Sequence, residues 1–211
     1  MRKALIGLLL AGWGMAATAE PVVIAALGDS LTQGYGLVPE QGFVPQLQRW
    51  LMAEGAEVTL INAGVSGDTT AGGAARVAWT LTPEVDAMIV ALGGNDLLRG
   101  IAPEVARGNL ATILTEAQRA GVAVLLVGMQ APGNYGADYK VAFDAIYPEL
   151  AAEHSALLAP SFFAGLMAEG DPAAAAGLMQ GDGIHPNAEG VARIVAALGP
   201  FVLDLVQAAE K

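Results

Sequence analysis

The chain has 211 residues, of which 54% are hydrophobic and 15% are charged, so it is long enough to form one sizeable hydrophobic core. Its formal charge of −11 and its lack of a polybasic run argue against a nucleic-acid partner, because such binding depends on many Lys and Arg contacts to phosphate. The sequence has no cysteine and only two histidines, with no H-E-x-x-H pattern, which excludes disulfides and Cys-based metal sites and gives a zinc hydrolase little support.

The first nineteen residues have the three parts of a secretory signal peptide. Two basic residues precede the apolar stretch Ala4–Ala11, and Ala17–Ala19 gives the small-residue cleavage pattern. The apolar stretch is shorter than the roughly 20 residues that span a bilayer, which favours a cleaved signal over an uncleaved anchor helix. We therefore predict cleavage after Ala19, one mature domain over residues 20–211, a periplasmic or secreted location, and no stable membrane insertion.

The mature part alternates short apolar runs with longer segments of helical spacing. We expect five strands, at Val22–Leu27, Glu57–Ile61, Asp86–Leu92, Val122–Val127 and Ala156–Ala159. We expect five helices, at Phe43–Glu54, Ala71–Leu81, Pro103–Ala120, Asp138–His154 and Asn187–Ala209. Pro148 is expected to bend or shorten the fourth helix, and Gly199-Pro200 to interrupt the last, because proline cannot donate to the helix ladder.

Strands this apolar, separated by helices, predict an α/β fold: a three-layer α/β/α sandwich around a central, mostly parallel, five-stranded sheet. Ligands bind at the carboxyl ends of the strands in such sheets. Three glycine-rich turns follow the first three expected strands, at Gly28–Ser30, Ala63–Asp68 and Leu92–Asp96. We expect these turns to converge on one edge.

A serine near the start and an Asp-x-x-His near the end have the chemical parts for acyl transfer, in the chain order Ser…Asp…His. Ser30 lies in Gly28-Asp29-Ser30-Leu31, and Asp182 and His185 lie in one turn bounded by glycine and proline. Each could alone be an ordinary turn residue, and the combination favours catalysis. His154 is interpreted as a solvated histidine or as a histidine at the C-terminal end of an expected helix, where a cation is favoured.

Four blocks in this order resemble the SGNH hydrolase superfamily, also called the GDSL esterase/lipase family. The blocks are Gly28–Leu31, Asn62–Asp68, Gly93–Asp96 and Asp182–Pro186. Further stretches resemble its bacterial periplasmic thioesterase/lysophospholipase branch, and similar arylesterases share them. These stretches are Leu92–Gly100, Asn134–Gly136, Phe143–Pro148 and Met179-Gln180. The resemblance implies the flavodoxin-like sheet of SGNH hydrolases.

The resemblance also implies a role for each residue of the site. Ser30 would be the nucleophile, His185 the general base, and Asp182 the carboxylate that orients the histidine. The backbone N–H groups of Ser30 and Gly67 and the side-chain amide of Asn95 would form the oxyanion hole. We expect the neighbouring Asp29, Asp68 and Asp96 to point elsewhere and to serve loop hydrogen bonds.

Substrate binding is assigned to apolar side chains around the third turn and near the histidine. Leu97, Tyr135 and Met179 are the candidate residues, and Leu97 and Leu98 are expected to be exposed. Further candidates for the walls of the cleft are Tyr35, Leu37 and Leu178. The alternative is that these residues are ordinary core or scattered surface residues.

The predicted function is a serine esterase that hydrolyses aryl and acyl esters, with lysophospholipids and acyl thioesters as further candidates. It would act on small-molecule or lipid-like substrates, and we expect neither a cofactor nor a metal. Two alternatives stay open on the same fold. One is a carbohydrate or cell-wall O-acetyl esterase with a small polar pocket, and the other is a non-catalytic binding protein.

Overall fold

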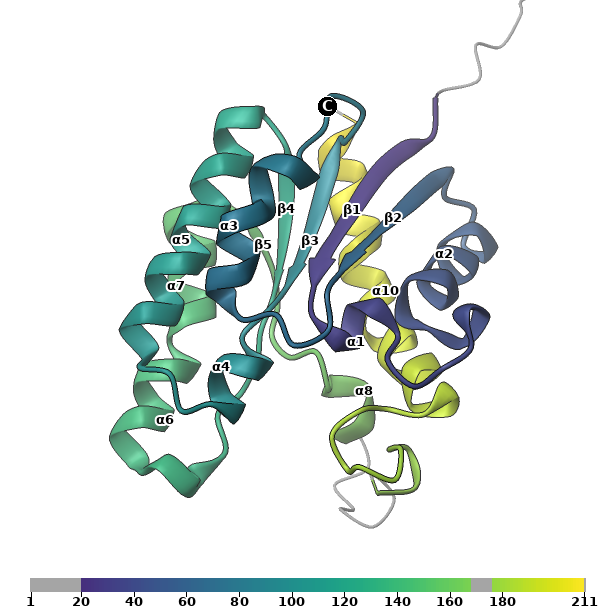
Figure 1. The fold of residues 1–211 in the computed structure, drawn as a ribbon. Helices are drawn as coiled ribbons and strands as arrows, with labels where there is room; N and C mark the ends of the chain where they lie inside the picture. The colour runs from purple at the N-terminus through teal and green to yellow at the C-terminus, as the bar shows by residue number, and fades with distance from the viewer. Residues whose placement is uncertain (1–19, 168–175, 211) are drawn as a thin grey trace, which may run out of the picture.

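The structure is a computed structural model that describes residues 20–167 and 176–210. The predicted signal peptide, residues 1–19, lies outside the described residues. In the described part of the chain, helices cover both faces of a central sheet (Figure 1). This is the predicted three-layer α/β/α architecture.

The sheet has five strands in the order β2-β1-β3-β4-β5, and all neighbouring strands are parallel. The strands are β1 (Val22–Gly28), β2 (Val58–Gly64), β3 (Ala87–Ala91), β4 (Ala123–Val127) and β5 (Leu157–Ala159). The chain first adds β2 on one side of β1 and then crosses to the other side for β3. Two crossovers in opposite directions leave a crevice at the carboxyl ends of the strands, where parallel sheets bind ligands.

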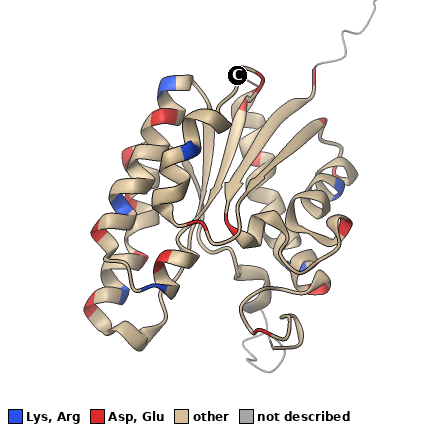
Figure 2. Ribbon diagram, in the orientation of Figure 1, with Lys and Arg blue, Asp and Glu red and all other residues tan. Residues whose placement is uncertain are grey.

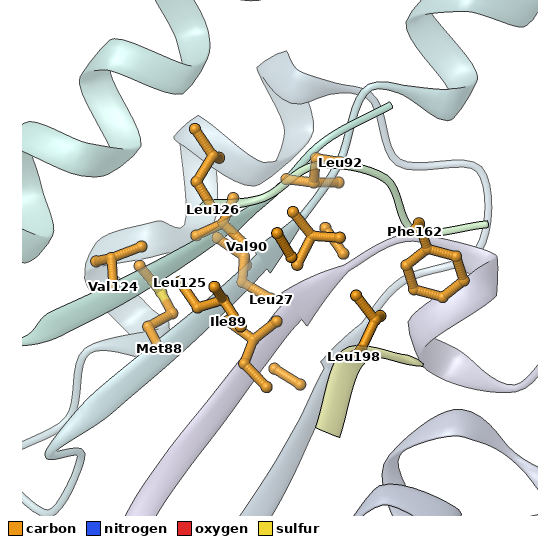
Figure 3. Packing of buried hydrophobic residues seen from close by; sticks show 14 of the residues in the cluster. Leu27, Met88, Ile89, Val90, Leu92, Val124, Leu125, Leu126, Phe162 and Leu198 are labelled. Carbon is orange, nitrogen blue, oxygen red and sulfur yellow. The ribbon is translucent and has the colours of Figure 1, made fainter. Parts of the chain in front are cut away.

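Helices of the two outer layers enclose this sheet (Figure 1). One layer contains α3 (Thr70–Thr80), α5 (Pro103–Ala120) and α7 (Ile146–Glu153), and the other contains α2 (Phe43–Ala53) and α10 (Ala188–Ala209). Because both faces are covered, the strands need apolar residues on both sides. Leu27, Ile89 and Leu126 are accordingly at most 1% exposed (Figure 3), and the strands carry no charged residue (Figure 2).

The predicted helix over Asp138–His154 is in fact two helices, α6 (Ala137–Asp144) and α7, which meet at Ala145. Pro148 lies in the first turn of α7, where its missing N–H leaves the Asp144 carbonyl without the usual helix partner. The proline therefore does more than bend the helix, because a new helix starts just before it.

The predicted interruption of the last helix is wrong, since α10 runs for 22 residues with Pro200 inside it. Pro200 and Ala196, whose carbonyl would accept from residue 200, are both exposed, so water can solvate that carbonyl. Buried residues on either side, among them Leu198 and Val202, keep the helix on the sheet. The apolar composition of α10 approaches that of a membrane span, and packing against α2, α8 (Ala164–Met167) and the sheet accounts for it.

Several short helices were not predicted, and two of them lie where the chain leaves a strand. They are α1 (Ser30–Gln33) after β1 and α4 (Gly94–Leu98) after β3. The other short segments are the 3-10 turns Pro39–Gln41 and Gly133–Tyr135, and α8. Helices of one turn carry too little periodicity to be recognised from hydrophobic spacing.

Gly64, the last residue of β2, allows α1 to pack closely against the end of β2. A Cβ at this position would lie 2.3 Å from the Gln33 nitrogen and 2.9 Å from the Asp29 oxygen, both backbone atoms. We expect Gly64→Ala to lower the free energy of unfolding by about 1–3 kcal/mol, as overpacking does elsewhere. Urea denaturation measures this change.

The matched control is Gly108→Ala in the exposed interior of α5, where a Cβ meets nothing within 4 Å. In this variant the free energy of unfolding should rise by about 0.5–1 kcal/mol, because alanine has a higher helix propensity than glycine. Equal effects of the two substitutions would contradict the close approach at Gly64.

Candidate active site

Turns from three neighbouring strands and one segment near the C-terminus meet at a single cavity of about 970 Å³. Ser30 begins α1 directly after β1, Gly67 follows β2, and Asn95 lies in α4 after β3. His185 comes from the segment that precedes α10. All four residues line the cavity, so the expected convergence of the three glycine-rich turns on one edge of the parallel sheet is confirmed.

The side chains of Ser30, His185 and Asp182 form a continuous hydrogen-bonded chain. The Ser30 Oγ lies 2.8 Å from His185 Nε2, and His185 Nδ1 lies 2.7 Å from Asp182 Oδ2. An ionised carboxylate only accepts hydrogen bonds, so the Nδ1 facing it carries the ring proton. Nε2 is then free to accept the proton of the serine hydroxyl, as a general base must.

The turn that carries Asp182 and His185 is closed by the carboxylate itself. Asp182 Oδ1 accepts hydrogen bonds from the backbone N–H groups of Ile184, at 2.9 Å, and His185, at 3.0 Å. The His185 N–H, the His185 ring and the Ile184 N–H, in this order, hold the pKa of the Asp182 carboxyl well below its ordinary value of 3.8. The group therefore stays ionised above that pH, and the stability it contributes is lost only as the pH falls below 3.8.

The imidazole also packs against the ring of Tyr35, whose backbone is tied to the segment that carries the histidine. The ring of Tyr35 lies 4.6 Å from the ring of His185, centroid to centroid. Gln180 Nε2 donates to the backbone oxygens of Tyr35, at 2.8 Å, and Pro186, at 3.0 Å, which ties the two segments together. Tyr35 thus contacts the histidine and also lines the cavity.

The two turns beside Ser30 are fixed by arginines that sequence reasoning missed. Arg76 on α3 donates to Asp68 Oδ2 at 2.7 Å, to the Ala63 oxygen at 2.7 Å and to the Gly28 oxygen at 2.9 Å. It therefore joins the ends of β1 and β2. These contacts link positions far apart in the chain, and a lone arginine in a helix gives no sequence signal for them.

Gly67 has φ of +83°, a conformation that favours glycine, and the missing side chain leaves its backbone open to the cavity. Arg99, which follows α4, donates to the Gly67 oxygen at 2.8 Å. This bond connects the turn after β2 to the helix after β3. Gly67 and Asn95, the two candidate oxyanion residues outside the first block, are thereby held together.

The three aspartates that neighbour Ser30, Gly67 and Asn95 in the sequence do serve loop hydrogen bonds, as predicted. Asp68 binds Arg76, and Asp96 accepts from the Thr70 N–H at 2.9 Å and hydroxyl at 2.6 Å. For Asp29, the expectation that the side chain points away from the site is wrong. Asp29 lines the cavity and accepts a hydrogen bond of 3.2 Å from the side-chain amide of Asn95.

The three candidate substrate-binding residues, Leu97, Tyr135 and Met179, line the cavity. Leu97 is only 8% exposed, however, whereas Leu98 is 60% exposed. The expectation that both are exposed is therefore wrong for Leu97, because α4 turns it inward. Apolar residues that also line the cavity are Leu98, Met129, Phe163, Leu166 and Ile184.

Two further wall candidates, Leu37 and Leu178, do not line the cavity. Leu178 is a buried core residue, and Leu37 packs partly buried against the core. The alternative interpretation as core is therefore the right one for these two. His154 follows α7 at its C-terminal end, where its ring lies 3.1 Å from Gln118 Oε1, far along the chain from Ser30.

The sequence matches the family model described as GDSL-like lipase/acylhydrolase over residues 26–193. Esterase TesA of Pseudomonas aeruginosa is 38% identical over 207 residues, which cover 98% of this chain and all of that protein. Thioesterase 1/protease 1/lysophospholipase L1 of Escherichia coli K12 is 37% identical over 174 residues, 82% of this chain and 78% of that protein.

Solved structures share the fold as well. The crystal structure of AlinE4, an SGNH-hydrolase family esterase, superimposes with a TM-score of 0.72 and 45% sequence identity. The match covers 89% of this chain and 98% of that one.

The role of Asp182 in setting the tautomer of His185 is tested by Asp182→Asn. The asparagine oxygen can still accept from the backbone, but its NH₂ would face Nδ1 and move the ring proton to Nε2, which then cannot accept from Ser30. We expect kcat for an ester to fall by about 10³–10⁴-fold while the fold is kept. Steady-state kinetics and circular dichroism measure both, and a loss of less than tenfold would contradict this role.

Proposed function

This chain belongs to the GDSL-like lipase/acylhydrolase family and is an esterase, and we propose that it hydrolyses esters through an acyl-enzyme on Ser30. The observation that carries the proposal is the hydrogen-bonded chain from Ser30 through His185 to Asp182 at the edge of the cavity. A serine hydroxyl is a weak nucleophile by itself and needs such a base beside it.

In the first step, Ser30 Oγ attacks the carbonyl carbon of the ester while its proton moves to His185 Nε2. The tetrahedral intermediate collapses, the C–O bond to the alcohol breaks, and His185 returns the proton to the leaving oxygen. In the second step, His185 takes a proton from water, the hydroxide attacks the acyl-enzyme, and the carboxylic acid leaves as Ser30 regains its proton. Asp182 stabilises the imidazolium in both steps.

The negative charge on the carbonyl oxygen needs donors that are already in place. We assign the backbone N–H groups of Ser30 and Gly67 and the side-chain amide of Asn95 to this task. Their positions at the ends of three adjacent strands support the assignment, as do the bonds of Arg76 and Arg99 that hold the turns.

The size and lining of the cavity favour a substrate with an apolar acyl chain over one with a small polar acyl group. Its lining beyond the reacting residues is mainly apolar and includes Leu97, Met179 and Tyr135. An O-acetyl esterase would be expected to have a small polar pocket, and this cavity of about 970 Å³ does not favour that alternative. Aryl and acyl esters, lysophospholipids and acyl thioesters are the substrates to test.

The location of the enzyme and its mature N-terminus belong to the same proposal. The n-region, apolar stretch and cleavage pattern in residues 1–19 support export to the periplasm or medium, with cleavage after Ala19. The mature single domain would then comprise residues 20–211.

Hydrolysis of p-nitrophenyl esters from acetyl to palmitoyl tests the mechanism and the acyl preference together. We expect wild-type activity to peak at medium or long chains, since the cavity walls can bury methylene groups. Ser30→Ala should lose the burst of p-nitrophenolate and about 10⁴-fold or more of kcat.

The two histidines of the chain provide a matched pair of controls. His185→Ala should be as inactive as Ser30→Ala, whereas His154→Ala should keep wild-type kinetics. Wild-type rates in purified Ser30→Ala would refute the acyl-enzyme, and activity confined to acetyl esters would favour the O-acetyl esterase.

A further inference from the structure

The turn that presents Ser30 contains a buried carboxylate that the two-step mechanism does not use. Asp29 is 1% exposed and lines the cavity between Ser30 and the turn of Asn95. Burial is the main cause that raises the pKa of Asp29 to about 6 from its ordinary 3.8. Because the folded chain then binds the proton more tightly than the unfolded chain, the stability contributed by Asp29 is lost as the pH rises from 3.8 to about 6.

Both oxygens of this carboxylate are engaged by the elements that supply oxyanion donors. Asp29 Oδ1 accepts from the Leu31 N–H at 3.0 Å, which caps α1 and fixes the turn containing the Ser30 N–H. Asp29 Oδ2 accepts from Asn95 Nδ2 at 3.2 Å. One carboxylate therefore bonds to α1, which begins at Ser30, and to Asn95, two of the three elements that carry the assigned oxyanion donors.

The amide of Asn95 has two N–H groups, and Asp29 engages one of them. Within residues 20–167 and 176–210, the Asn95 side chain has no other hydrogen-bond partner, and Asn95 lines the cavity. The bond to Asp29 also fixes which end of the amide is which, since a carboxylate selects the NH₂ and repels the carbonyl oxygen. The second N–H is then presented on the side away from Asp29.

We propose that Asp29 is the positioning residue of the oxyanion hole, which holds the Asn95 amide with its second N–H toward the reacting carbonyl oxygen. The inference rests on the proposed function, because it assumes that Asn95 is an oxyanion donor. Asp29 acts through Asn95 and the Ser30 turn and does not itself contact the reacting atoms. A buried charge at this place is thus explained by the donor geometry that it imposes.

The substitution Asp29→Asn separates positioning from capping. Its side-chain oxygen can still accept from the Leu31 N–H, since Asn caps helices as well as Asp does. Its NH₂ would face the NH₂ of Asn95, so the Asn95 amide turns over and offers its carbonyl oxygen to the oxyanion. We expect kcat to fall by about 10²–10³-fold, as on the loss of one oxyanion donor, with KM little changed.

A double-mutant cycle with Asn95→Ala distinguishes this role from a structural one. Asn95→Ala alone should lose about the same factor in kcat, and adding Asp29→Asn to it should cause no further loss. The unfolding temperature of Asp29→Asn at pH 8 should equal or exceed that of the wild type, because a buried charge has been removed. A purely structural aspartate would give losses that multiply and a lower unfolding temperature.

Two further variants complete the design. Asp86→Asn changes an aspartate at the opposite end of β1, whose carboxylate accepts from the Val23 N–H at 2.8 Å. It should keep the wild-type kcat. If Asp29→Asn does not fold, Asp29→Ser keeps a capping hydroxyl that is too short to hold Asn95, and its loss of kcat should vanish in the Asn95→Ala background.

The outcomes separate this inference from the function on which it rests. A loss in Asn95→Ala with no further loss on adding Asp29→Asn supports the inference. A loss in Asn95→Ala that multiplies with that of Asp29→Asn overturns the inference alone. Full activity in Asn95→Ala overturns the oxyanion assignment, and the inference falls with it.

Discussion

The carboxyl end of β1 is the point on which the site depends, because β1 is the strand from which the chain turns to both sides of the sheet. β2 and β3 lie parallel on either side of it, with Gly28 opposite both Gly64 and Ala91. Parallel strands in register end at the same edge, so the turns that follow them start at one level. Backbone pairing of the strands therefore brings Ser30, the proposed nucleophile, to the same edge as both neighbouring turns.

A few polar contacts, most of them partly buried, then select one arrangement of these turns. Arg76 binds the Gly28 and Ala63 oxygens, Arg99 binds the Gly67 oxygen, and Asp29 binds the Asn95 amide. A shift of one turn would break these bonds. Where the groups are partly buried, as for Arg76 and Asp29, it would leave a donor or acceptor without its partner, which is costly. The hydrophobic layers provide the stability of the domain, while these contacts provide the orientation that the chemistry needs.

Hydrophobic spacing was sufficient to predict the main elements and their order from the sequence. The prediction was best where both ends carry a local signal, as in α5, which begins at Pro103 and ends at Ala120 before a glycine in the left-handed conformation. It was incomplete at Pro148, where the expected bend is a break between α6 and α7, and it was wrong at Pro200. Pro148 lies at a helix start, whereas Pro200 is tolerated inside α10 because its face is solvated, and spacing along the chain does not distinguish burial from exposure.

The serine, aspartate and histidine of the site could be predicted because short motifs carry them. The residues that orient them could not, since Arg76 and Gly28 are 48 positions apart and Asp29 and Asn95 are 66 apart. The residue type at one position does not predict which distant residue it will bond to. Leu97 shows the same limit, because only the short helix α4 decides that it faces inward while Leu98 does not.

The proposed mechanism requires that Ser30 is the nucleophile and that His185 activates it. The most direct measurement is mass spectrometry of the protein after incubation with an alkyl fluorophosphonate, which forms a stable adduct only with an activated serine. We expect one adduct per chain, on the peptide that contains Ser30, and no adduct in His185→Ala. An adduct on another serine, or equal labelling of Ser30 without His185, would contradict this mechanism.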